Sequence, residues 1–107
     1  MPRHPSAPRW QDPVLDEAAL DVARAMRAAV RELGESSPRW ATWFEALVPA
    51  LEDGDRPALE AAAKRARAAF GAKDSVLDVW TAPEARELRD LIDRLQRVLA
   101  QRGASGA

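Results

Sequence analysis

Prolines and glycines alternate along this chain and divide it into four segments of helical length. Proline stands near the start of each segment and glycine near its end. This is the usual asymmetry of helix termini, because proline lacks an amide hydrogen and glycine accepts irregular backbone. The prolines are Pro13, Pro38, Pro57 and Pro83, and the glycines are Gly34, Gly54, Gly71 and Gly103. The spacing predicts helices over about 13–33, 38–53 and 56–70, and a fourth helix that begins with the capping-box pattern Thr81 to Glu84 and runs to about Arg102.

Each segment carries an apolar stripe at the three- and four-residue steps that place side chains on one face of a helix. The second segment has the heaviest stripe: Trp40, Trp43, Phe44, Leu47, Val48 and Leu51. Pro49 interrupts this segment, but the stripe keeps its phase on both sides, so we expect a kink in the helix and not its end. The pattern predicts an all-α fold, a single-domain antiparallel four-helix bundle.

The other three stripes are lighter and rich in alanine and leucine. They are Leu15, Ala19, Val22, Met26, Ala29 and Leu33; Leu59, Ala62, Ala63, Ala66 and Phe70; and Leu88, Leu91, Ile92, Leu95, Val98 and Leu99. Asp12, Asp55 and either Ser36 or Ser37 stand where helix N-caps are expected. The connection at 71–80 is unusually apolar, and we expect it to pack on one end of the bundle.

The two ends of the chain differ in composition from the helical domain predicted over 10–102. Residues 1–9 contain three prolines and little to bury, which predicts a flexible N-terminal arm. Trp10 is expected to fold back as a plug over the core, the alternative being that the arm docks on a partner. The tail at 103–107, GASGA, is predicted to be disordered.

Charge and composition argue against several classes of partner. The 16 basic and 17 acidic side chains leave a net charge of −1, so no bulk field draws the chain to nucleic acid or an anionic membrane. The basic cluster Lys64, Arg65 and Arg67 lacks interleaved aromatic residues, and we expect no nucleic-acid binding. No run approaches ~20 apolar residues, and the N-terminus does not resemble a secretory signal. We therefore expect a cytoplasmic protein.

Catalytic chemistry is poorly supported by the residue types present. Cysteine is absent, and the only histidine, His4, lies in the predicted arm, which argues against a nucleophilic triad and against histidine or cysteine metal sites. Glu52, Asp53 and Asp55 surround Gly54 like a cation-binding loop, but a helix end followed by an N-cap explains them better. Exposed carboxylate pairs such as Asp74 with Asp78 usually lack an acid–base role. The sequence predicts no enzyme activity, cofactor or metal.

A set of residues between 40 and 80 resembles a pattern found in short, mostly helical bacterial proteins of uncharacterised function. The set comprises Trp40, Trp43, Leu47, the run from Leu51 to Asp55, Phe70, Gly71, Ser75 and the run from Asp78 to Trp80. Such proteins sometimes accompany toxins as immunity partners, so the resemblance implies a binding role. It singles out Asp55, Ser75, Asp78 and Trp80, which would fix the loop against the tryptophan helix, with Asp78 accepting backbone amides.

Two functional hypotheses remain from the sequence. The first is a protein-binding domain, such as an immunity- or antitoxin-like inhibitor, whose acidic surface meets a partner with a basic face. That surface would comprise Glu45, Glu52, Asp53, Asp55, Asp74 and Asp78. The second is a module that homodimerises through exposed parts of the tryptophan helix and the fourth helix. The sequence leaves open whether Trp10, Trp40, Trp43 and Trp80 belong to the core or to an interface.

Overall fold

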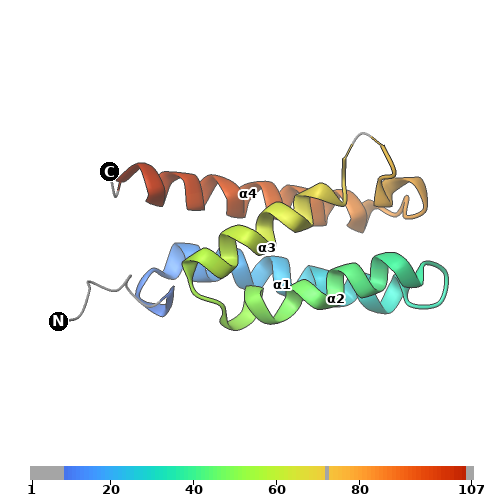
Figure 1. Ribbon diagram of the computed structural model, residues 1–107, viewed down its shortest axis with the longest axis horizontal. Coiled ribbons are helices and arrows are strands. Elements are labelled where there is room, and N and C mark those ends of the chain that lie inside the picture. The colour runs from blue at the N-terminus through green and yellow to red at the C-terminus, as the bar shows by residue number, and fades with distance from the viewer. Residues whose placement is uncertain (1–8, 72, 106–107) are drawn as a thin grey trace.

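The computed structural model describes residues 9–71 and 73–105, without the side chains of Trp10 and residues 103–105. This part of the chain is all-α. Its helices are α1 (Pro13–Leu33), α2 (Pro38–Asp53), α3 (Arg56–Ala68) and α4 (Pro83–Ser105), with the short 3-10 helices η1 (Arg9–Gln11) and η2 (Val76–Asp78). The predicted antiparallel four-helix fold is confirmed (Figure 1). The predictions for residues 1–8, for the side chain of Trp10 and for residues 106–107 lie outside the described part.

The helices form a ring in which each one packs against two others. α1 contacts α2 and α4, and α3 contacts the same two helices from the other side. In Figure 1, α1 and α2 lie side by side at the bottom, α4 lies at the top, and α3 crosses obliquely between them. The chain reverses direction at each connection, so neighbouring helices are antiparallel.

The helix starts follow the predicted chemistry. Proline occupies one of the first two positions in α1, α2 and α3, and α4 begins with proline. The carboxylate of Asp12 accepts a hydrogen bond from the Leu15 amide at 3.3 Å, and that of Asp55 accepts one from the Ala58 amide at 3.1 Å. These bonds satisfy amides that have no partner within the helix. Ser37 precedes α2, but its side chain makes no capping hydrogen bond.

The helix ends follow the glycine pattern only in part. Gly34 and Gly54 directly follow α1 and α2. α3 ends at Ala68, two residues earlier than predicted, and α4 continues through Gly103 to Ser105. The end predicted near Arg102 was therefore placed too early. One glycine weakens a helix by about 1 kcal/mol relative to alanine and need not end it.

The four predicted stripes form the core. All their residues are buried except Trp43 and Leu91, which are half-buried and pack against the same cluster. The rings of Phe44 and Phe70 lie 6.3 Å apart between centroids, joining α2 to the turn after α3. In the described residues no buried side-chain nitrogen or oxygen lacks a hydrogen-bond partner. Packing of apolar side chains therefore holds the bundle together, without the cost of an unpaired buried polar atom among these residues.

α2 continues through Pro49 to Asp53, so the prediction that this proline does not end the helix is confirmed. Val48 and Leu51, on either side of it, are both buried. Pro49 itself is exposed, so its ring does not displace core side chains. A bend at this position stays a prediction.

The connection between α3 and α4 packs on the bundle as expected. Val76 and Trp80 are buried in the core, and the Val76 amide donates to the Ala69 carbonyl at 2.8 Å. The indole Nε1 of Trp80 donates to the Glu32 carboxylate on α1 at 2.9 Å. The connection is thus fixed both to the end of α3 and to α1.

At the opposite end of the molecule, the side chain of Arg9 connects η1 to α1 and α2. Arg9 donates to the backbone carbonyls of Ala50, Leu51 and Gly54 at 3.3, 2.7 and 3.2 Å, which lie at the C-terminal end of α2. Arg9 also pairs with Asp16 at 2.7 Å. Because the last carbonyls of a helix lack internal partners and carry partial negative charge, a cation is stabilising there. Arg9, assigned to the N-terminal arm from the sequence, thus lies in η1 and contacts the end of α2.

We expect Gly54→Ala to destabilise the fold. A Cβ atom at Gly54 would lie 2.5 Å from the Ala50 carbonyl oxygen and 2.9 Å from the Ala58 Cβ, and backbone would have to move. The free energy of unfolding should fall by about 1–3 kcal/mol, the usual range for overpacking. The control is Gly34→Ala, whose Cβ would meet its nearest atom, the Val30 oxygen, at 3.2 Å. Equal urea midpoints for the two variants would contradict this account.

A second prediction concerns Asp12 and acid stability. The side chain of Arg102 donates to Asp12 at 2.6 and 2.9 Å and lowers the pKa of this carboxyl below its usual value. The pKa of Asp12 is lower in the folded state than in the unfolded state. Ionised Asp12 therefore stabilises the fold fully above the unfolded-state pKa, and this contribution is lost as pH falls through the folded-state pKa. Asp12→Asn keeps a capping oxygen but removes the charge. Its deficit in unfolding free energy at neutral pH should shrink in acid.

Denaturant unfolding from neutral to acidic pH measures this deficit. Asp53→Asn is the control, because Asp53 is exposed and takes part in no ion pair of the described residues. A deficit for Asp12→Asn that stays constant across the whole pH range would rule out the charge pair as its cause.

Candidate interaction surface

The six carboxylates nominated from the sequence do not come together in one patch. Asp74 is paired with Arg39 near the start of α2, whereas Asp53 is the last residue of that helix. The fourteen residue steps from position 39 to position 53 correspond to roughly 21 Å of helix, at 1.5 Å per residue. The nominated residues therefore spread along α2, with Asp74 near its start, Glu45 at its middle, and Glu52 and Asp53 at its end.

Two of the six carboxylates are neutralised by arginines from other segments. Arg27 on α1 donates to both Glu52 oxygens at 2.7 and 2.8 Å, and this bonding lowers the pKa of Glu52. Arg39 on α2 donates to both Asp74 oxygens at 3.0 and 2.6 Å and lowers the pKa of Asp74 in the same way. Such two-pronged pairs orient both side chains. The charge assumed to be unpaired is therefore paired at these two positions.

The Arg39 pair involves a residue with unusual backbone geometry. Asp74 has a φ of 54°, in the left-handed region that a residue with a side chain rarely adopts. The Arg39 guanidinium lies 4.6 Å from the ring centroid of Trp40, so it contacts an aromatic face and a carboxylate together. Aspartate adopts this region more readily than most residues with a side chain, and the ion pair lies at the protein surface.

Two further carboxylates serve as caps within the backbone. Asp55 caps α3, as described above. Asp78 accepts from the Ser75 amide at 3.2 Å, while the Ser75 hydroxyl accepts from the Leu77 amide at 3.1 Å, a reciprocal capping box at the start of η2. The expectation that Asp78 accepts a backbone amide is confirmed. This leaves Glu45 and Asp53 as exposed carboxylates outside any ion pair of the described residues.

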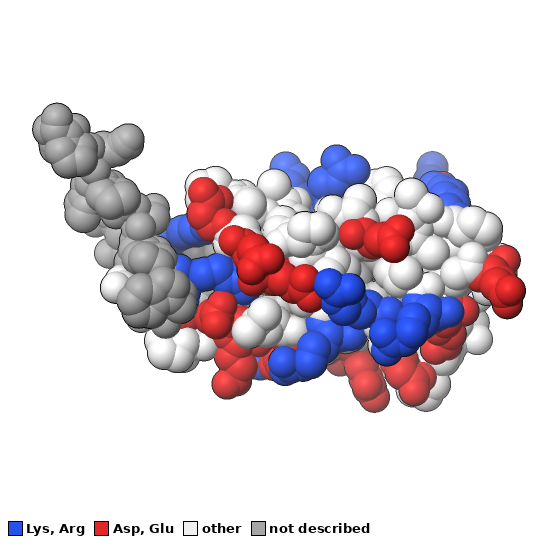
Figure 2. Space-filling model, turned by 90° about the horizontal axis from the view of Figure 1, so that it is seen from below, with Lys and Arg blue, Asp and Glu red and all other residues white. Residues whose placement is uncertain are grey.

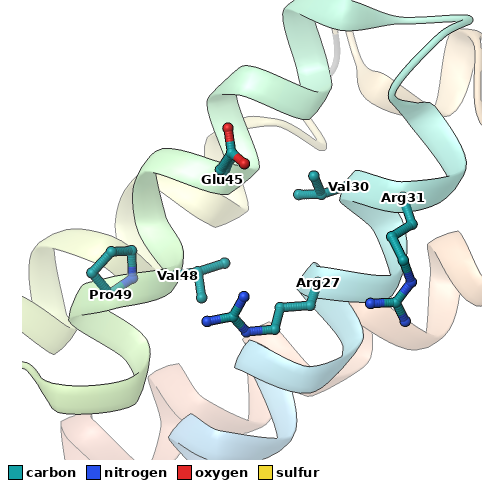
Figure 3. A pocket seen from close by; sticks show the side chains of 6 residues that line it. All are labelled: Arg27, Val30, Arg31, Glu45, Val48 and Pro49. Carbon is teal, nitrogen blue, oxygen red and sulfur yellow. The ribbon is translucent and has the colours of Figure 1, made fainter.

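Glu45 borders a groove between α1 and α2, which we call the α1–α2 groove (Figure 3). Its volume is about 350 Å³. Arg27, Val30 and Arg31 contribute from α1, and Glu45, Val48 and Pro49 contribute from α2. The floor is aliphatic, and the rim carries two positive charges and one negative charge. This groove is therefore not an acidic site.

The face on which α1 and α2 lie carries charges of both signs. Figure 2 shows acidic and basic side chains interspersed over it, without a broad area of one sign. Mixed charge of this kind gives specificity through matched pairs and not through a long-range field. A partner's basic face would meet separate carboxylates here.

The three tryptophans whose side chains the structure describes are mainly structural. Trp40 and Trp80 are 6% and 4% exposed and belong to the core. Trp43 is half-buried, its Nε1 donates to the Arg65 carbonyl at 3.1 Å, and the Arg65 guanidinium lies 5.2 Å from its ring centroid. Arg65, from the basic cluster on α3, therefore covers Trp43.

Sequence reasoning did not nominate Glu32, Glu84 and Glu87, which border a second, narrower depression between α1 and α4. Glu84 and Glu87 stand three residues apart, and this spacing alone places them on one face of a helix. The position of Glu32 opposite them depends on how α1 and α4 pack. No pattern within a single segment reveals that register.

Neither a metal site nor a membrane segment is found in the described part of the chain. No group of three or more histidine or carboxylate side chains there could hold a metal ion. None of the helices searched is both long and apolar enough to cross a bilayer. Comparison of the chain with protein-family models, curated proteins and solved structures finds no match.

Ser75→Ala is expected to loosen the connection that positions Asp78. The substitution leaves the Leu77 amide without its 3.1 Å acceptor, and Ser75 is only 8% exposed, so water replaces the hydroxyl poorly. Loss of a serine cap costs about 1 kcal/mol. Denaturant unfolding and hydrogen exchange at the Leu77 amide measure the effect. Ser36→Ala, at an exposed turn position, is the control, and equal exchange in both variants would contradict the prediction.

Proposed function

We propose that this chain is a non-enzymatic protein-binding domain that recognises a basic face of its partner through separate exposed carboxylates. The observation that carries the proposal is the distribution of its side chains. Apolar residues are committed to one core, and carboxylates without internal cations stand beside grooves between the helices. Preformed helical grooves with charged rims are a common means of peptide and protein recognition.

The more specific form of the proposal is an inhibitor, of the immunity or antitoxin kind, that occludes a site on another protein. Its support is the fold itself, since a small bundle of rigid helices presents a fixed surface and loses little conformational entropy on binding. Glu45 and Asp53 are the members of the nominated set best able to contact a partner. Glu52 and Asp74 would first have to exchange their arginines for partner groups.

Homodimerisation through α2 and α4 is the alternative. The structure offers it limited apolar area, because Val14 and Val79 are the only large hydrophobic residues exposed in the described part of the chain. Stable homodimers usually bury extensive apolar surface. Light scattering across a concentration series tests this alternative without any added partner.

The experiment for the main proposal is affinity capture of the tagged protein from its own host, followed by measurement of the captured partner's affinity. We expect Glu45→Lys combined with Asp53→Lys to weaken the complex by about tenfold or more, because like charges then face the basic surface. Asp55 is left intact because reversing it would also remove the cap of α3. The matched control is Glu35→Lys, at another exposed glutamate.

The folded state should tolerate these changes, so circular dichroism and melting temperature should stay close to the wild type. Equal affinity for the wild type and the double variant would remove Glu45 and Asp53 from the interface. Recovery of the protein alone, as a monomer, would argue against the proposed function as a whole.

A further inference from the structure

A narrow depression, which we call the α1–α4 slot, lies between the second half of α1 and the first half of α4. Its apolar wall is formed by Ala25, Ala28 and Ala29 from α1, together with Leu91 and Trp80. Its volume is about 190 Å³. Since an apolar cavity of about 150 Å³ accepts a benzene molecule, the slot has room for one long side chain.

Three carboxylates border this apolar wall. Glu32 comes from α1, and Glu84 and Glu87 come from α4. All three are exposed, and no lining residue of the slot carries a positive charge. Glu32 already accepts the Trp80 indole hydrogen at 2.9 Å, which fixes one carboxylate at the edge of the slot.

The nearby basic residues of α1 do not line the slot. Arg24 pairs with Asp21, and Arg31 lines the α1–α2 groove. The negative rim of the slot is thus not offset by these two arginines.

Arg94 shows that an arginine side chain can bridge the boundary between α1 and α4. Farther along the same α1–α4 boundary, Arg94 of α4 donates to Asp21 at 3.1 Å and to Glu17 at 3.3 Å, both on α1. Leu91, which lines the slot, stands three residues before Arg94, and Ala25 stands four residues after Asp21. Arg94 therefore bridges the helices about one turn from the slot.

An arginine side chain meets the requirements of the slot better than a metal ion. Its aliphatic stem packs along apolar surface while its planar head reaches carboxylates. Within the described residues the three glutamates do not form a group that could hold a metal ion. The alanines, the leucine and the indole form an apolar wall for a long side chain. The separated carboxylates suit a positive charge at its end.

We infer that the α1–α4 slot binds an arginine side chain of the partner protein, with the stem against Ala28 and Leu91 and the guanidinium between Glu84 and Glu87. This inference rests on the proposed protein-binding function and gives it a location. The slot, on the α1–α4 side, then serves as the anchor of the complex. Glu45 and Asp53 belong to α2 and would contribute separately.

A peptide titration tests the slot without knowledge of the natural partner. The isotope-labelled full chain is titrated with an acetylated, amidated Leu-Arg-Leu peptide and, as the matched probe, the Leu-Gln-Leu peptide. We expect saturable amide shifts over residues 25–32 and 84–91 and at the Trp80 indole for the arginine peptide. The glutamine peptide should bind at least about tenfold more weakly, because charge-assisted hydrogen bonds are lost.

Glu84→Gln combined with Glu87→Gln should weaken the arginine peptide by about tenfold. Glu35→Gln combined with Glu60→Gln, at two exposed glutamates that do not line the slot, is the matched control with the same change of charge, and it should leave peptide binding unchanged. If the double variant is unstable, the titration uses Glu87→Gln alone, which leaves Glu84 in the first turn of α4 unchanged. Equal binding of the two peptides, shifts mapping elsewhere, or an unaffected Glu84/Glu87 variant would overturn the inference.

The captured partner separates this inference from the proposed function. A partner that loses affinity for the Glu84/Glu87 variant supports both. A partner that binds this variant normally refutes the slot while leaving the protein-binding function in place. A dimer of the chain that dissociates when Glu84 and Glu87 are neutralised would put a second copy's arginine in the slot and refute the assignment to a foreign partner.

Discussion

The close packing of α1 against both α2 and α4 is the constraint on which the rest of the structure depends. α1 buries small side chains at Ala18, Ala19, Ala23 and Ala29, none more than 1% exposed, alongside larger residues such as Met26. Small residues let helix axes approach closely, so the larger side chains of two neighbouring helices can meet over the same stretch of α1. α3 then contacts α2 and α4 from the other side and completes the ring. Enlarging the alanine face would separate three helices at once.

The same alanines explain why depressions remain at the surface. At the outer edge of the α1–α4 boundary, Ala25 and Ala28 are too short to cover the space between the helices, and long charged residues stand around them. Arginine side chains bridge helices at other places: Arg27 joins α1 to α2 beside the α1–α2 groove, Arg67 joins α3 to α4 through Asp93, and Arg94 joins α4 to α1 about one turn from the slot. Where no arginine is available, the carboxylates stay open to solvent.

Helix positions, apolar stripes and the caps at Asp12 and Asp55 could be predicted because each depends on residues only a few positions apart. The ion pairs could not. Arg27 and Glu52 are 25 residues apart and Arg39 and Asp74 are 35 apart, and their meeting depends on the register in which whole helices pack. An acidic surface inferred by counting charges along the chain therefore included carboxylates that the fold neutralises. It also omitted Glu32, which lies opposite Glu84 and Glu87 only because α4 packs beside α1. Likewise, Arg9 looks like part of a mobile arm until the carbonyl end of α2 is placed beside it.

Internal pairing also determines which carboxylates can recognise a partner. A carboxylate such as Glu52, held by two hydrogen bonds from Arg27, offers little to an incoming cation, because any new contact must first replace an existing one. An exposed carboxylate without an internal cation exchanges only water, so a partner's guanidinium gains the full interaction less the cost of ordering both groups. Apolar surface beside that carboxylate improves the balance, because the stem of the arriving side chain leaves water at the same time. Under the proposed binding function, recognition is therefore most favourable where an apolar wall and uncompensated carboxylates coincide, as they do between α1 and α4.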